Sequence, residues 1–237
     1  MPLRLLAAAS LSLALLFAGC ASPRGMATLD DAASVAKPTK NVYLLTVTLR
    51  NTHTPAYQPK LNAVKILKIT GPETYKTLRF EADLTSRSES DRAEIGSNYL
   101  LRLEMEPGQY VIMGLESWGQ AMIMSGDFFT PLGNRLTVPA NNPGIRYLGH
   151  IDAVLRARKG DEFRACSTLP TQEQRLTGAY NGTFDVVITD QWETDSVKFQ
   201  TKFPALKDAK VTKFLIPPYN RETIQRWWDK NLFNEMP

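Results

Sequence analysis

The main pattern along the chain is an alternation of apolar and polar residues with a period of two. It is clearest at residues 43–49, where Tyr43, Leu45, Val47 and Leu49 are apolar, and it returns at residues 101–105. A period of two is typical of a strand with one buried face. Other apolar segments of strand length lie at residues 64–69, 75–81, 110–115, 122–129, 135–138, 145–158, 184–188 and 211–216. The pattern therefore predicts seven to ten short strands.

Helical periodicity is confined to the last fifth of the chain. Asp190 could cap a helix that ends at Phe203-Pro204. Asn220 could cap a second one, in which one face carries Ile224, Trp227, Trp228 and Leu232. Strands separated by Gly/Pro turns, with one or two late α-helices, predict a mainly β fold: an antiparallel β-sandwich rather than βαβ units.

The first twenty residues have a different organisation. Arg4 is the only charge of a short head, residues 5–17 are apolar apart from two serines, and Phe17-Ala18-Gly19 precedes Cys20. This order is that of a secretory signal, and the apolar run is too short to span a bilayer. An ordinary signal peptide that happens to contain Cys20 is the alternative.

The segment from Phe17 to Cys20 resembles the lipobox of bacterial lipoproteins, with Phe17 in place of the usual leucine. The resemblance implies that residues 1–19 are removed and that Cys20 carries three acyl chains, such as palmitate. Two membrane signals already suffice for stable anchoring, so membrane lipid is the expected partner of Cys20. An aspartate at position 21 would favour retention in the inner membrane. Ala21 instead resembles an outer-membrane address, with the domain on either the periplasmic or the surface side of that membrane.

We expect four segments along the chain. After the signal peptide (1–19), residues 20–40 are rich in Ala, Ser, Thr and Pro and predict a lipidated flexible tether. The β-sandwich domain should then cover residues 41–217, and an amphipathic helix packed on it should cover residues 218–237.

Charge and cysteine content exclude some functions. Removal of residues 1–19 takes one arginine from 28 basic and 24 acidic residues, which leaves a net charge of +3. The charge is spread along the chain, so no nucleic-acid partner is expected. With Cys20 lipidated, Cys166 has no internal disulfide partner, and we interpret it as a small buried apolar residue.

Candidate catalytic residues are few. The two histidines are His53, in a proline-flanked loop, and His150. His150 and Asp152 would lie on one face of a strand and could contribute to a metal site, but a half-exposed histidine beside an acid is the simpler interpretation. No serine-hydrolase, phosphate-loop or dinucleotide motif is present. We therefore expect no enzyme, no metal and no cofactor; the alternative is a surface-attached hydrolase that uses carboxylates or a His150/Asp152 metal site.

Three tryptophans are candidates for partner binding. Trp227 and Trp228 could be buried where the last helix covers the sandwich, or could form a docking or membrane-interface face. Trp118 could stack on a sugar, which would fit a carbohydrate or peptidoglycan binder. The possible partners are thus an envelope protein or an envelope polysaccharide.

The segment 103–112 (LEMEPGQYVI) resembles the L-x-P-G-x-Y hairpin of prealbumin-like and carboxypeptidase-regulatory-like β-sandwiches. Residues 147–151, 190–195 and 203–206 look like those of uncharacterised bacterial lipoproteins built on such a sandwich. The resemblance implies a prealbumin/immunoglobulin-like sandwich. Because such sandwiches serve many purposes, it leads only to a general expectation: a non-enzymatic binding or structural module of the cell envelope.

Overall fold

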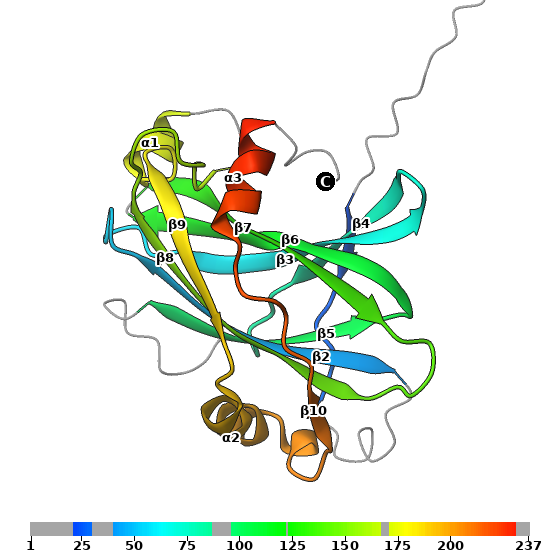
Figure 1. Ribbon diagram of the computed structural model, residues 1–237. Helices are drawn as coiled ribbons and strands as arrows, with labels where there is room; N and C mark the ends of the chain where they lie inside the picture. The colour runs from blue at the N-terminus through cyan, green and yellow to red at the C-terminus, as the bar shows by residue number, and fades with distance from the viewer. Residues whose placement is uncertain (1–20, 30–39, 87–95, 122, 167–170, 231–237) are drawn as a thin grey trace, which may run out of the picture.

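Two β-sheets packed face to face make up most of the computed structural model, which describes residues 21–29, 40–86, 96–121, 123–166 and 171–230 (Figure 1). The strands are β1 (Ser22–Arg24), β2 (Asn41–Asn51), β3 (Lys60–Gly71), β4 (Thr74–Glu81), β5 (Ser97–Met105), β6 (Gly108–Ala121), β7 (Met124–Val138), β8 (Ile145–Ala157), β9 (Gly182–Thr189) and β10 (Val211–Lys213). The helices are α1 (Gln172–Leu176), α2 (Trp192–Lys202) and α3 (Arg221–Asp229), with a 3-10 turn η2 (Pro204–Leu206). The predicted mainly β sandwich with late helices is confirmed.

The strand order combines antiparallel and parallel pairs. One sheet, called sheet A, has the order β1-β4-β3-β6-β7, and the other, sheet B, has the order β10-β8-β2-β5, with β9 also paired to β8. The hairpins are antiparallel, but β2 and β8 pair in parallel, as do β1 with β4 and β10 with β8. Parallel pairing needs a long connection between the two strands. Between β2 and β8, that connection contains all the strands from β3 to β7. The two segments predicted at 122–129 and 135–138 form one strand, β7.

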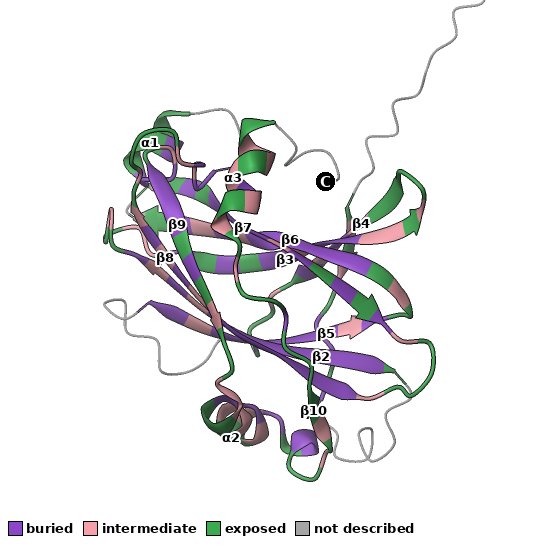
Figure 2. Ribbon diagram, in the orientation of Figure 1, coloured by how far each residue is buried: buried purple, intermediate pink, exposed green. Residues whose placement is uncertain are grey.

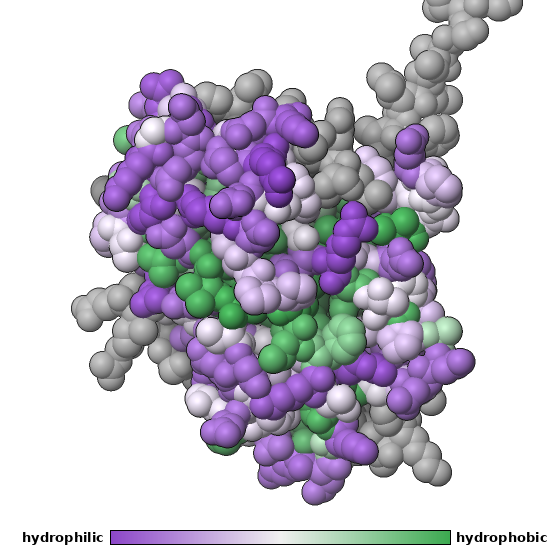
Figure 3. Space-filling model, in the orientation of Figure 1, coloured by the Kyte–Doolittle hydropathy of each residue, from purple (hydrophilic) through white to green (hydrophobic). Residues whose placement is uncertain are grey.

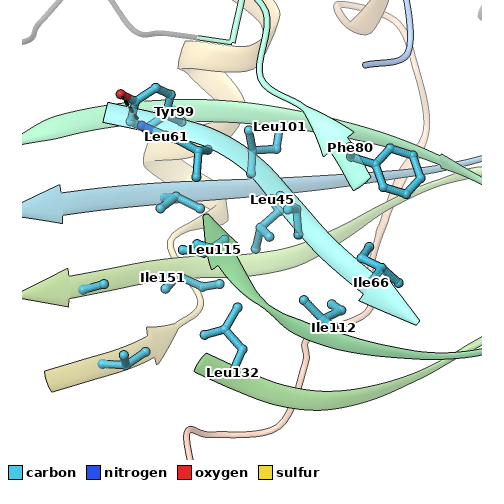
Figure 4. Close-up of a cluster of buried hydrophobic side chains, with 14 of the residues drawn as sticks. Leu45, Leu61, Ile66, Phe80, Tyr99, Leu101, Ile112, Leu115, Leu132 and Ile151 are labelled. Carbon is cyan, nitrogen blue, oxygen red and sulfur yellow. Dashed lines mark hydrogen bonds between the residues drawn. The ribbon is translucent and has the colours of Figure 1, made fainter. Parts of the chain in front are cut away.

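The core lies between the sheets, as the buried stretches in Figure 2 and the side chains in Figure 4 show. The alternating residues of β2 point into it and are fully buried, as are Leu101 and Leu103 of β5. They meet Ile66, Ile112 and Leu115 from sheet A. The period of two thus identified the inner face of β2 and β5 correctly.

Residues 21–29, here called the N-terminal strap, close one side of the sandwich. Ser22 pairs with Leu78 at the edge of sheet A, and the N–H of Ala27 donates to the carbonyl of Arg102 in sheet B, at 2.8 Å. Between them Met26 is buried in the core. The predicted flexible tether over 20–40 is therefore wrong for residues 21–29, and the sandwich begins well before residue 41. Residues 30–39 lie outside the described part of the chain.

Residues 211–220, here called the C-terminal strap, close the opposite side. After β10, the N–H of Ile216 donates to the carbonyl of Leu148 in sheet B, and the side chain of Asn134 in sheet A donates to the carbonyl of Pro217. The strap leads into α3, whose cap is Asn220: its side chain accepts from the N–H of Thr223 at 2.9 Å. The predicted cap is thus confirmed.

Helix α2 and η2 cover part of the outer face of sheet B, where a second, smaller core forms. It contains Leu44, Tyr147 and Leu100 from the sheet and Phe199 and Phe203 from α2 and its end. Sheet B is consequently buried on both faces at this end, which a period-two pattern does not predict.

A bulge in β8 changes the register of sheet B beside this core. The parallel pairing passes from Leu44–Tyr147 to Leu45–Gly149 and so skips Leu148. Gly149 has a φ of 123° and would bring a Cβ to 3.1 Å from the carbonyl oxygen of Thr189. This position therefore favours glycine, which adopts a positive φ and leaves room for the neighbouring carbonyl.

Candidate functional site

His150 lies beneath helix α2 and has little contact with solvent. It projects from β8 on the outer face of sheet B and is 6% exposed. Its Nδ1 lies 2.9 Å from Oγ1 of Thr46, and its Nε2 lies 3.4 Å from Oγ1 of Thr48, both on β2. The imidazole is therefore held beside two threonine hydroxyls of the adjacent strand.

The acid nearest to His150 is Asp195, from the first turn of α2. Its buried carboxylate accepts hydrogen bonds from the hydroxyls of Thr46 and, at 2.6 Å, Tyr147. Its Oδ2 lies 3.9 Å from Nδ1 of His150, and Nζ of Lys198 lies 3.2 Å from its Oδ1. Because Thr46 donates its proton to Asp195, its oxygen can accept a hydrogen bond from Nδ1 of His150 when that nitrogen is protonated.

Burial shifts the pKa of two groups in this cluster. Loss of water lowers the pKa of His150, and the negative charge of Asp195 opposes that effect. The pKa of Tyr147 is raised, first by burial and then by its hydrogen bond to Asp195. Both shifts favour neutral side chains around the Asp195 carboxylate. The result is a closed hydrogen-bonded cluster that fastens α2 to sheet B, and a substrate could reach it only by displacing the helix.

His150 and Asp152 share a face of β8 but do not converge. Asp152 binds Arg50 instead, with 2.7 Å between Oδ2 and the guanidinium nitrogen, while His150 lies against Thr46 and Asp195. Within the described ranges, no three His, Cys, Asp or Glu side chains could hold a metal ion together. The arrangement thus offers no support for the metal-dependent alternative.

Asp195 is the member of this cluster that sequence reasoning missed. An acid in the first turn of a helix is normally explained by the helix dipole, and Asp195 has such a position. The available signal was in β2, where Thr46 follows the apolar Val42 and Leu44 on the outer face and is buried like them. A buried hydroxyl needs a partner, and α2 supplies it.

The tryptophans proposed for partner binding are half-buried. Trp227 and Trp228 pack against the main core, and the ring of Trp227 covers Gly133 of β7. Trp118, on β6, has the ammonium group of Lys60 at 4.9 Å from its ring centroid. These contacts give Trp227 a packing role in α3, whereas one side of the Trp118 ring is already occupied by a cation.

Of the two cysteines, Cys166 lies in the described part of the chain and Cys20 does not. The lipidation of Cys20 therefore stays a prediction. Cys166 is a free, buried cysteine, and burial raises the pKa of its thiol. This confirms its interpretation as a small apolar core residue. Among the helices of the described segments, none is long and apolar enough to cross a bilayer.

An exposed apolar patch lies over β9 and the C-terminal strap. Figure 3 shows hydrophobic residues gathered in the middle of this face. Val187, Phe214 and Leu215 are exposed by 56%, 42% and 46%, and Ile188 is half-buried. Ile188 and Leu215 both lie within 4 Å of the position that a Cβ on Gly149 would take, so they are neighbours. Val187 lies opposite Asp152 of β8 and therefore points to the other face of sheet B from Ile188, which lies opposite Ile151. We call Ile188, Phe214 and Leu215 the front patch.

Comparison with known proteins adds little to this geometry. No family model and no curated protein matches the chain. It shows a likeness to the solved structure of catechol 1,2-dioxygenase from Acinetobacter inhibited by bound mercury, with 10% identity and a TM-score of 0.17. The match covers 84% of this chain and 59% of the dioxygenase chain. At that TM-score the likeness carries no argument about fold or activity.

Proposed function

We propose that this chain is a lipoprotein of the bacterial outer membrane whose β-sandwich acts as a non-enzymatic binding module. The anchor rests on the segment from Phe17 to Cys20, and the outer-membrane address rests on Ala21. Three acyl chains on Cys20 would make the attachment effectively permanent.

The observation that carries the binding role is the front patch. Soluble domains rarely leave several large apolar side chains together in solvent, and such groups mark interaction sites. Leu215 and Phe214 lie on a strap that is bonded to both sheets, so the patch is held on a rigid support. Its chemistry suits an apolar surface of an envelope protein.

The buried cluster around Asp195 supports a non-enzymatic role. His150 lies beside the buried acid Asp195, and its ring nitrogens already face Thr46 and Thr48. A general base needs to reach a substrate proton at hydrogen-bond distance, which the cover of α2 prevents.

The anchor is tested by metabolic labelling with palmitate and by membrane fractionation. We expect the wild-type protein to carry label and to sediment with membranes, and Cys20→Ala to lose both. Cys166→Ala is the matched control, since it removes the other cysteine and should keep the label. Label on Cys20→Ala, or its absence from the wild type, would refute the anchor.

The binding role is tested by photo-crosslinking in intact cells with a crosslinking residue at Leu215 or at Thr137, an exposed position on β7. We expect one discrete adduct from position 215, its loss in Phe214→Glu, and no such adduct from position 137. The same adducts from both positions, or no adduct from 215, would argue against a binding surface here.

A further inference from the structure

The N-terminal strap leaves almost no slack between the proposed anchor and the folded domain. Ser22 is already paired with Leu78, and Met26, Ala27 and Leu29 are buried. Ala27 is held twice, because its N–H donates to the carbonyl of Arg102 and its own carbonyl accepts from Nε of Arg102 at 2.7 Å. Ala21 is therefore the only described residue between residue 20 and the paired strand.

The pairing of β1 determines which end of the sandwich lies beside the anchor. β1 runs parallel to β4, with Ser22 opposite Leu78 and Arg24 opposite Phe80. The start of β1 consequently points toward the start of β4, which is the β3–β4 hairpin (Figure 1). The tip of this hairpin is residues 70–76, which we call the hairpin tip.

The short distance between Ala21 and the hairpin tip would place the tip at the membrane surface. Consecutive Cα atoms are about 3.8 Å apart, and the headgroup layer of a bilayer is roughly 5–8 Å thick on each side. Acyl chains on Cys20 would reach into the hydrocarbon, so Ala21 would lie at the depth of the headgroups. A surface next to Ala21 on a rigid sheet has to lie there too.

The exposed residues of the hairpin tip suit that environment. Tyr75 is 40% exposed, and Lys76 is exposed beside it. Tyrosine favours the interface between lipid and water, and lysine binds anionic headgroups. The neighbouring acid Glu106 is already paired with Lys68 at 2.7 Å, which leaves Glu73 as the exposed acid of the tip.

We propose that the hairpin tip is a membrane-contact surface, on which Tyr75 lies among the lipid headgroups and Lys76 pairs with their phosphates. The proposal rests on lipidation of Cys20. It makes the domain lie directly on the bilayer, with the β3–β4 end inward and the opposite end outward.

The contact can be measured by fluorescence quenching on full-length lipidated protein in vesicles of phosphatidylethanolamine and phosphatidylglycerol that contain a headgroup nitroxide lipid. One fluorophore is attached at Thr74→Cys and, in a second sample, at Ala56→Cys. Ala56 precedes β3, and the 12 residues of that strand separate the two positions by roughly 35–40 Å. The unsubstituted protein, in which Cys166 is buried, is the labelling blank.

We expect strong quenching at position 74 and little at position 56. Lys76→Glu should weaken the quenching at 74, and Lys159→Glu, an exposed lysine beyond the end of β8, should not. Equal quenching at both positions, or stronger quenching at 56, would overturn the proposal. Flotation with the vesicles separates the two hypotheses: protein that does not float refutes the anchor, and protein that floats without quenching at 74 refutes the contact surface alone.

Discussion

The carboxylate of Asp195 has no contact with solvent, and its hydrogen bonds determine how firmly α2 is held on sheet B. It binds one hydroxyl from β2, one from β8 and the ammonium group of Lys198 on its own helix. A buried carboxylate needs such partners to offset its loss of water. The buried hydroxyls in turn need the carboxylate as their hydrogen-bond acceptor. The cluster therefore acts as a unit.

Asp195→Ala should be strongly destabilising. It leaves the hydroxyls of Thr46 and Tyr147 buried without their acceptor, and breaking a buried charged network costs about 3 kcal/mol or more. Denaturant unfolding would measure the loss in free energy. Glu193→Ala, on an exposed position of the same helix, should change it by less than about 0.5 kcal/mol. Equal effects of the two changes would contradict the role of Asp195.

His150 should make the protein less stable in acid. Burial lowers its pKa in the folded state, so the unfolded chain binds the proton more readily. The groups that face it are Asp195 and Lys198 from α2 and Asp152 from β8. The stability that neutral His150 contributes is fully present above the pKa of histidine in the unfolded chain, about 6.5. It is lost as the pH falls through the lower pKa of His150 in the folded protein.

Melting temperatures measured between pH 8 and pH 5 would test this. The fall in melting temperature on acidification should be smaller in His150→Gln than in the wild type. It should persist in His53→Gln, which removes the other histidine of the chain. A His150→Gln protein with the full acid sensitivity of the wild type would rule the mechanism out.

At the scale of elements, helix α3 is held by the fit between Trp227 and Gly133. Gly133 has a φ of 69°, and a Cβ there would lie 2.6 Å from the indole ring. Ile224, fully buried, completes the contact. The closeness of the helix to β7 thus depends on a residue with no side chain.

Gly133→Ala and Trp227→Ala should each destabilise the protein, by about 1–3 kcal/mol through strain and lost packing respectively. The double variant should lose less than the sum, because removal of the indole makes room for the methyl group while the backbone strain remains. A double-mutant cycle by denaturant unfolding measures this coupling. Strict additivity would show that the two residues do not depend on each other.

At the scale of the whole molecule, only some parts of the structure can be predicted from sequence patterns. The alternation at Tyr43–Leu49 predicted β2 because the main core buries every second residue. The polar cap at Asn220 predicted α3 because capping is a local interaction. Residues 22–24 gave no strand signal, since a Ser-Pro-Arg segment has no periodicity and its pairing with β4 is long-range. The buried Asp195 was missed for the same reason: its partners lie far away in the chain.

Removal of the N-terminal strap should destabilise the whole sandwich. A soluble chain that begins at Lys40 loses the burial of Met26 and the bonds of Ala27 to Arg102. Loss of one buried methionine alone costs about 2–5 kcal/mol. Compared with a chain that begins at Ala21, its melting temperature should fall by many degrees. Equal melting temperatures would mean that residues 21–29 do serve as a free tether.

The N-terminal strap also determines how the molecule would respond to mechanical force. Tension on the anchor would act first on the start of β1, along the axis of the strand, and would shear its hydrogen bonds to β4 before it drew Met26 from the core. The nine residues released would extend by roughly 30 Å. The sandwich could then move away from the membrane under load while the inner strands, further from the point of attachment, stay paired. The strap would thus act as an extensible coupling between the lipid anchor and the domain.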